Sequence, residues 1–166
     1  HFERRYGFRT RPLLQRFRIL DERRHIHGLS DLTLRADEFS ILDPPVDVVF
    51  VTENDINALA FPPVRNGMVL FGRGYGFETL TDARWLHQKR IFYWGDIDTH
   101  GFAILNQFRS LFPQTGSLLM DRTTLLEHKN RWVTEATPCD AGLSNLREAE
   151  KELYDDLRTN RLGERV

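Results

Sequence analysis

The stretch Arg90-Ile-Phe-Tyr-Trp-Gly-Asp-Ile-Asp98 decides the fold. The four apolar or aromatic residues after its first arginine predict a strand buried on both faces of a parallel sheet. Two aspartates, Asp96 and Asp98, follow this strand with Ile97 between them. Because side chains alternate along extended backbone, both carboxylates can lie on one side while Ile97 points into the core. Gly101 then allows the backbone to turn into a helix.

The rest of the chain repeats this pattern of an apolar run followed by a helical segment. The alternation predicts an α/β domain with a mostly parallel four-stranded sheet flanked by helices. An antiparallel β-hairpin from 15–20 and 31–42, around Gly28, is expected before it. An amphipathic helix over 143–162 is expected to pack on the domain or contact another subunit. The strands are predicted at 47–52, 68–71, 90–94 and 117–120, and the other helices at 55–60, 79–88, 100–112 and 123–128.

Composition limits the class of protein. The chain has 166 residues, of which 40% are hydrophobic and 28% charged, and this suits one globular domain. No apolar stretch approaches the roughly 20 residues that cross a bilayer. The single cysteine, Cys139, excludes an internal disulfide and suits a reducing cytoplasm. Because the chain starts at His1 and not at Met, we expect it to be part of a longer protein.

Charge is distributed unevenly along the chain. The formal net charge is -1, yet residues 1–24 hold eight arginines against three acids, or +5. We therefore expect a basic amino-terminal extension with the hairpin, residues 1–45, ahead of a catalytic region, residues 46–166. Such asymmetry permits contact with nucleic acid, although a general preference of the genome for arginine over lysine would explain it equally well.

A third acidic residue, Glu53, follows the predicted strand 47–52. Ligands collect outside the carboxyl ends of the strands in an open parallel sheet, so Glu53, Asp96 and Asp98 are expected to converge. Carboxylates this close repel one another unless a cation neutralises them, and an all-oxygen set favours Mg²⁺, or Mn²⁺ in its place, over Zn²⁺. Such a site suits phosphoryl transfer, with Glu53 as a metal ligand or a base. The alternative is three separately solvated surface acids.

Glycines follow the predicted strand 68–71, in the sequence Gly72-Arg-Gly-Tyr-Gly76. Gly72 and Gly74 would allow backbone amides to approach a phosphate, and Arg73 would offer a forked cation to the phosphate oxygens. The same loop could be a tight turn with no ligand. Its position beside the acids favours phosphate or DNA binding.

Together these segments resemble the Toprim domain of type IIB topoisomerase A subunits and their meiotic break-forming relatives. That family has a strand ending in Glu, a strand ending in Gly-Lys-Gly-Tyr and an Asp-x-Asp strand end, which correspond here to Glu53, 72–75 and 96–98. Residues 51–61 and 93–105 are more similar still to the nuclease subunit of the Wadjet anti-plasmid defence system. This similarity covers most of the chain.

The resemblance implies a Toprim fold, which is Rossmann-like, and a Mg²⁺-dependent endonuclease that cleaves double-stranded circular DNA. It implies a condensin-like SMC ATPase complex as partner, a prokaryotic cytoplasm near the nucleoid, and further amino-terminal domains. Arg73 stands where the topoisomerases have Lys, and Thr99-His100 stands where they have Pro-Tyr. Because no tyrosine is marked as a nucleophile, we expect hydrolysis by water and not topoisomerase activity. Cutting both strands would most simply require a homodimer.

Other candidate residues have weaker cases. Asp121 follows the predicted strand 117–120 and could add a carboxylate to the metal site or could cap the next helix. His100 comes directly after the acids and could contact a phosphate or form only a local hydrogen bond. His25 and His27 lack a third ligand for zinc. The tryptophans stand in or near apolar segments and are assigned to the core, not to DNA bases.

Three other functions are alternatives. Asp96-Ile-Asp-Thr99 matches the Asp-x-Asp-x-Thr pattern of haloacid-dehalogenase-like phosphatases, in which Asp96 would be the nucleophile. That motif normally follows the first strand, whereas here it follows the third, and it leaves Glu53 unexplained. A dinucleotide-binding domain is weaker, because the glycine spacing differs from Gly-x-Gly-x-x-Gly. The non-enzymatic alternative is a DNA-binding or assembly module with a catalytically inert Toprim fold.

Overall fold

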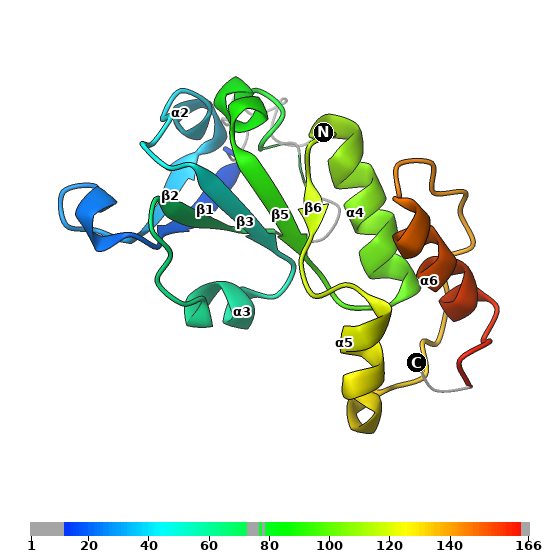
Figure 1. Ribbon diagram of the computed structural model, residues 1–166. Helices are drawn as coiled ribbons and strands as arrows, with labels where there is room; N and C mark the ends of the chain where they lie inside the picture. Colours follow the sequence, from blue (N-terminus) through cyan, green and yellow to red (C-terminus); the bar gives the residue numbers. More distant parts are fainter. Residues whose placement is uncertain (1–11, 73–76, 78, 164–166) are drawn as a thin grey trace, which may run out of the picture.

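The computed structural model describes residues 12–72, 77 and 79–163. Within them, six strands form one mixed sheet in the order β2-β1-β4-β3-β5-β6 (Figure 1). The pairs β4·β3, β3·β5 and β5·β6 are parallel, and β1 is antiparallel to both of its neighbours. The mostly parallel α/β architecture predicted from the sequence is confirmed. The strands are β1 Leu14–Ile19, β2 Asp31–Arg35, β3 Val48–Thr52, β4 Gly67–Phe71, β5 Arg90–Trp94 and β6 Gly116–Ser117.

Helical segments cover both faces of this sheet (Figure 1). On one face, the short helix α3 contributes Ala58 to a small apolar cluster with Phe61 and Phe71. On the other face, α4 contributes Phe102 and Phe108 to the main core. No helix in the described residues is long and apolar enough to cross a membrane. The α-helices are α2 Ala36–Ser40, α3 Asp55–Ala60, α4 Thr99–Leu111, α5 Arg122–Glu127 and α6 Glu148–Arg158, and the 3₁₀ segments are Glu22–Arg24, Arg84–Gln88 and Lys129–Arg131.

The amino-terminal hairpin is part of the sheet. Residues 17–19 of β1 pair antiparallel with residues 68–70 of β4, and Phe17 lies fully buried opposite Leu70. Where a strand is expected to continue to residue 42, β2 stops at Arg35 and α2 follows. The reason is local, because the Glu38 carboxylate accepts a hydrogen bond from the Arg35 N–H and so satisfies the backbone at the helix start. The four-stranded sheet predicted for the catalytic region is thereby extended to six strands.

The expected helix over 79–88 is wrong for its first half. Residues 79–82 form turns, and only Arg84–Gln88 is helical, as a 3₁₀ segment. The N–H groups of Leu80, Ala83 and Leu86 each donate to the carbonyl oxygen three residues earlier, and all three side chains are buried. Apolar residues at a spacing of three suit a 3₁₀ geometry, in which side chains at i and i+3 eclipse, and do not suit the 3.6-residue period of an α-helix.

The fourth parallel strand is much shorter than the predicted 117–120. β6 contains only Gly116–Ser117, although the Leu118 N–H still donates to the Tyr93 carbonyl oxygen at 2.8 Å. The chain leaves the sheet at Leu119, whose φ of 56° lies in the left-handed region. Extended pairing is impossible at that φ, so the ladder ends there.

The carboxyl-terminal helix α6 packs against α4 through a buried ion pair. It spans Glu148–Arg158, shorter than the predicted 143–162, because its first turn forms only after Arg147, whose N–H donates to the Glu150 carboxylate at 2.8 Å. The Arg109 guanidinium of α4 binds both Glu150 oxygens, at 2.6 and 2.9 Å, and the Ser117 hydroxyl also donates to Glu150. One carboxylate thus joins α4, β6 and α6.

Replacing Glu150 with Gln is expected to lower the free energy of unfolding by about 3 kcal/mol at neutral pH, because the Arg109 charge would stay buried without its partner. Burial alone would raise the pKa of Glu150, but the hydrogen bonds from Arg109, Arg147 and Ser117 hold that pKa below its ordinary value. The contribution of the carboxylate is therefore complete above the unfolded-state pKa of about 4.3 and is lost as the pH falls through the folded-state pKa.

Urea unfolding of wild type and Glu150→Gln should accordingly show a stability difference that shrinks on acidification. Asp140→Asn is the matched control, because it removes an ion pair with Arg158 in which the aspartate side chain is 78% exposed. That variant should change stability by less than about 1 kcal/mol. Equal losses from the two substitutions would show that the buried pair adds nothing particular to the fold.

Candidate active site

Two acidic residues flank the point where the chain connections diverge. Glu53 follows β3, Asp96 follows β5, and the Glu53 N–H donates to the Trp94 carbonyl oxygen at 3.1 Å. From β3 the chain passes through α3 to β4 on one side, and from β5 it passes through α4 to β6 on the other. Open α/β sheets bind ligands at such a switch point. The structure thus brings both acids to the same edge of the sheet.

A hydrogen bond fixes the Glu53 side chain. The Tyr93 hydroxyl lies 3.1 Å from Glu53 Oε2, and the Tyr93 ring is almost completely buried. Burial raises the pKa of Glu53, and the nearby charges of Asp96 and Asp98 raise it further, while the hydrogen bond from Tyr93 partly offsets both effects. The raised pKa makes Glu53 a stronger proton acceptor than an ordinary carboxylate.

Gly95 lies where no side chain fits. A Cβ atom at this position would lie 2.8 Å from the Tyr93 hydroxyl oxygen and 2.9 Å from Glu53 Oε2. The Gly95 N–H lies 3.4 Å from the sulfur of Met120, which is itself in the core. The chain therefore passes closely over the Tyr93 and Glu53 pair, and this close passage positions Asp96 immediately afterwards.

Asp98 begins α4 and is engaged by the helix backbone. Its Oδ1 accepts a hydrogen bond from the Gly101 N–H at 2.6 Å. Gly101 is required here, because a Cβ at that position would stand 2.1 Å from the Asp96 carbonyl oxygen. Burial, and then the charge of Asp98, raises the pKa of Asp96. The two aspartates lie close enough to repel each other, as the Asp-x-Asp spacing predicts.

These carboxylates are not arranged as a ready-made metal shell. Among the residues that the structure describes, no three His, Cys, Asp or Glu side chains are placed to hold a metal ion. The donor chemistry nevertheless fits a hard cation, since Mg²⁺ is commonly held by one or two carboxylates while waters and substrate phosphates supply the remaining ligands. The pKa values of Glu53 and Asp96 are raised, and such a cation would stabilise the charged forms of these two carboxylates. The predicted set of Glu53, Asp96 and Asp98 stays a prediction.

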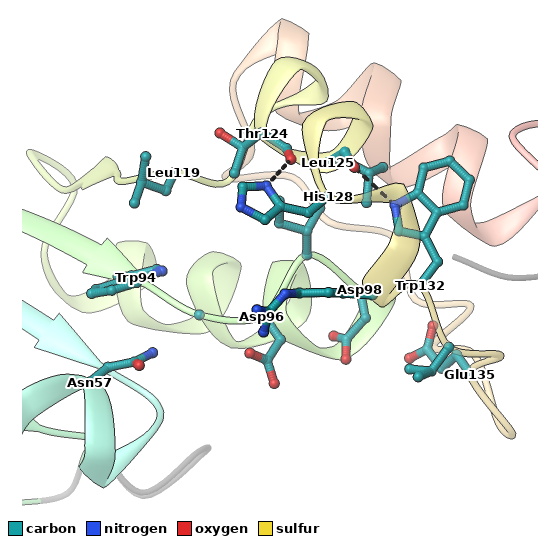
Figure 2. A pocket seen from close by; sticks show the side chains of 14 residues that line it. Asn57, Trp94, Asp96, Asp98, Leu119, Thr124, Leu125, His128, Trp132 and Glu135 are labelled. Carbon is teal, nitrogen blue, oxygen red and sulfur yellow. Dashed lines mark hydrogen bonds between the residues drawn. The ribbon is translucent and has the colours of Figure 1, made fainter.

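A cavity of about 530 Å³ opens beside the two aspartates. One wall consists of residues 94–98, at and after the end of β5. The opposite wall comes from Leu119, Thr124, Leu125, His128, residues 131–133 and Glu135. Figure 2 shows Asp96 and Asp98 along one side, with His128 and Leu119 across from them. The acids therefore border a recess large enough for a small ligand, where sites of roughly 300 to 1,000 Å³ are usual.

Glu135 is a residue of this region that the sequence did not single out. Its carboxylate accepts hydrogen bonds from the Thr99 hydroxyl at 2.8 Å and from the Thr99 N–H at 3.2 Å, at the start of α4. Residues 134–142 are irregular, but they are tied to the site by this contact and by the Cys139 N–H, which donates to the Thr99 hydroxyl. A carboxylate that caps a helix 36 residues away leaves no mark in local sequence patterns.

Comparison with known protein families shows to which family the chain belongs. Residues 7–166 match the family described as Wadjet protein JetD, C-terminal. The chain belongs to this JetD family. Membership implies a role in the Wadjet defence system, together with the other components of that system. The curated proteins contain no match to the chain. The family match gives no support to the phosphatase or the dinucleotide-binding alternative.

The remaining predicted site residues of this JetD-family chain have different outcomes. The Gly72 N–H donates to the Thr52 carbonyl oxygen at 2.8 Å, which ties the end of β4 to β3. Arg73 and Gly74 lie outside the described residues, so phosphate binding by this loop stays a prediction. Asp121 caps α5, because its Oδ1 accepts from the Thr124 N–H at 2.9 Å, and it is not part of the cavity lining.

His100 is exposed and forms a local hydrogen bond, and its predicted phosphate contact stays a prediction. Its Nε2 lies 2.9 Å from the Thr137 carbonyl oxygen and 3.7 Å from Glu135 Oε1. These contacts hold the irregular segment 134–142 against α4. The local hydrogen bond expected as one alternative is therefore present.

The tyrosines and tryptophans of the described residues differ in burial. Tyr93 and Tyr154 are buried, and burial raises both pKa values, that of Tyr154 to about 12, so both hydroxyls stay protonated. Trp85 lies in the core, as predicted, but Trp94 and Trp132 are only partly buried and line the cavity. Their positions at the end of β5 and after the last 3₁₀ segment are the signal that could have distinguished them from core residues. Tyr6 and Tyr75 lie outside the described residues.

Replacing Gly95 with Ala is expected to destabilise the JetD-family domain by about 1–3 kcal/mol, because the added methyl group must displace the Tyr93 hydroxyl or the Glu53 carboxylate. Thermal or urea unfolding measures the loss. Gly142→Ala is the control, since a Cβ there meets nothing within 4 Å, and it should stay within about 0.5 kcal/mol of wild type. Equal stability of both variants would mean that the contact around Gly95 is not tight in solution.

Proposed function

We propose that this domain is a Toprim-type, Mg²⁺-dependent endonuclease that cleaves double-stranded plasmid DNA for the Wadjet defence system. The observation that carries the proposal is the position of Glu53 and Asp96, at the carboxyl ends of neighbouring parallel strands and on either side of the switch point. Family membership supports the biological setting. The Asp-x-Asp strand end and the Glu strand end support the Toprim assignment by resemblance.

Repulsion among the three carboxylates supports a site that binds a cation together with a phosphate. Glu53, Asp96 and Asp98 interact unfavourably, and folding brings them together despite that cost. Perturbed pKa values of this kind cluster at functional sites. When bound, Mg²⁺ would neutralise these acids and draw charge from a phosphate oxygen. Glu53 and Asp96 would hold the ion, and Asp98 would contribute through its second carboxylate oxygen while Oδ1 accepts from the Gly101 N–H.

As the alternative to holding the ion, Glu53 is suited to act as the base. Its raised pKa favours proton uptake, and the Tyr93 hydroxyl fixes one of its oxygens. In hydrolysis, the water oxygen forms a bond to phosphorus and its proton passes to the Glu53 carboxylate. The bond from phosphorus to the departing nucleotide oxygen breaks, and that oxygen takes a proton from solvent. No tyrosine nucleophile is needed.

The proposed partners follow from the charge balance and the resemblance. With a net charge of -1 the chain binds DNA weakly by itself, so a condensin-like SMC ATPase complex would present the plasmid to it. Cleavage of both strands would use two active sites related by symmetry in a homodimer. The protein would then act in the prokaryotic cytoplasm, at the nucleoid.

The full-length protein, combined with its Wadjet partner proteins, is expected to linearise circular plasmid in Mg²⁺ or Mn²⁺. Glu53→Gln and Asp96→Asn should each reduce the rate by about a hundredfold or more, because each removes a charge that the reaction uses. Gel analysis of linear product measures the rate, and EDTA should abolish it.

Glu127→Gln is the matched control, because Glu127 is an exposed carboxylate of α5 that does not line the cavity. It should cleave at the wild-type rate. Cleavage by all variants alike would remove Glu53 and Asp96 from the mechanism. Retained plasmid binding without any cleavage by wild type would instead favour the inert DNA-binding or assembly module.

A further inference from the structure

The cavity beside Asp96 has aromatic and aliphatic walls that metal binding does not require. We infer that it receives a nucleobase rotated out of the DNA stack, with the attached phosphate at Asp96. This inference rests on the proposed nuclease function and names the form in which the substrate binds. A nucleotide combines a flat ring with an anionic phosphate, and the cavity combines apolar walls with acids suited to a phosphate-binding cation.

Trp94 forms one side of this cavity, which is called the slot below. It is the last residue of β5, paired with Thr52 of β3, and its ring packs edge-on against Phe61 at a centroid distance of 6.0 Å. The strand pairing and the Phe61 contact hold the indole in place while it stays only partly buried. In Figure 2 the Trp94 ring lies on one side of the cavity, with Leu119 and His128 on the other. A rigid, accessible indole face is what base stacking uses.

Leu119 forms the opposite side in a conformation that leucine rarely adopts. Its φ is 56°, and the residue is 49% exposed. The residues on either side are anchored, since the Leu118 N–H donates to the Tyr93 carbonyl oxygen and Met120 is buried in the core. An exposed leucine held in the left-handed region is strained, and such strain concentrates at ligand sites.

The cavity lining also includes polar groups for the edge of a base. His128 Nδ1 lies 2.9 Å from the Thr124 carbonyl oxygen. Because that oxygen only accepts, Nδ1 carries a proton. Arg131 also lines the cavity and supplies a cation. An aromatic side chain from a protein partner would fit the apolar walls but would leave the two aspartates without a ligand, whereas a nucleotide accounts for both.

The experiment compares two short single-stranded oligonucleotides of equal length and charge, an oligothymidylate and one in which abasic sites replace every base. Binding to the full chain is measured by fluorescence anisotropy in Mg²⁺, so that a cation is present for the phosphate, and gel analysis of the recovered strands checks that they are uncut. Wild type is expected to bind the base-containing strand roughly fivefold to a hundredfold more tightly, as expected for stacking of one base. Equal charge makes this ratio independent of phosphate repulsion.

Leu119→Gly should reduce the ratio to about one while keeping the fold, since glycine tolerates the positive φ. Trp94→Ala should do the same, and Trp94→Phe should keep part of the preference. Leu29→Ala is the matched control, because Leu29 is a 57% exposed leucine on the hairpin and should leave the ratio unchanged. Thermal unfolding of each variant checks that the fold is kept.

Three outcomes would each overturn the inference that the slot binds a nucleobase. They are a wild-type ratio of one, binding of neither strand, and an unchanged ratio in Leu119→Gly. Plasmid cleavage by wild type together with a ratio of one would leave the nuclease proposal in place and remove only the slot. A base preference that depends on Leu119, in a protein that cuts no plasmid, would support the slot and overturn the nuclease proposal.

Discussion

The rest of the site depends on the parallel pairing of β3 with β5 at their carboxyl ends. The Glu53 N–H continues the ladder by one bond beyond β3, to the Trp94 carbonyl oxygen. This bond keeps the register of the β3·β5 pairing, and in that register the Tyr93 hydroxyl reaches Glu53. A shift by one residue would turn Tyr93 to the other face and leave the Glu53 carboxylate without its donor. Register therefore determines the electrostatics of the site as well as its shape.

The main core provides the rigidity that holds unfavourable charges together. Tyr93 packs on Phe108 of α4, and Phe108 contacts Phe77 and Phe112 in the same cluster. Farther along α4, Arg109 binds Glu150 and so fixes α6 and β6. The site is thus supported from the apolar side by close-packed aromatic rings and a satisfied ion pair. Repulsion among three carboxylates would otherwise separate them, because exposed loops have no comparable resistance.

Sequence patterns predicted what depends on local periodicity. The strand at 90–94 and the helix at 55–60 have the predicted bounds, because continuous apolar runs and the proline pair at 62–63 act over a few residues. The convergence of Glu53 with Asp96 followed from a topological rule and not from spacing. Glu135 was missed because its partner, Thr99, is distant in sequence. The 3₁₀ segment was missed because a three-residue spacing of buried side chains matches the α-helical period over one turn and departs from it only over two or more.

Asp98 shows how one residue can serve the fold and the site in turn. Its carboxylate caps α4 through the Gly101 N–H, and that helix carries Phe102, Phe108 and Arg109 into the core. A carboxylate oxygen has more than one lone pair, and Asp98 has a second oxygen, so capping leaves coordination capacity toward the cavity that it lines. The Asp96 carboxylate does not cap α4 and is repelled by the charge of Asp98, and Asp96 is more exposed than Asp98. The two aspartates of the Asp-x-Asp strand end are therefore not equivalent: the first is available for ligand chemistry, and the second must first keep the helix in place.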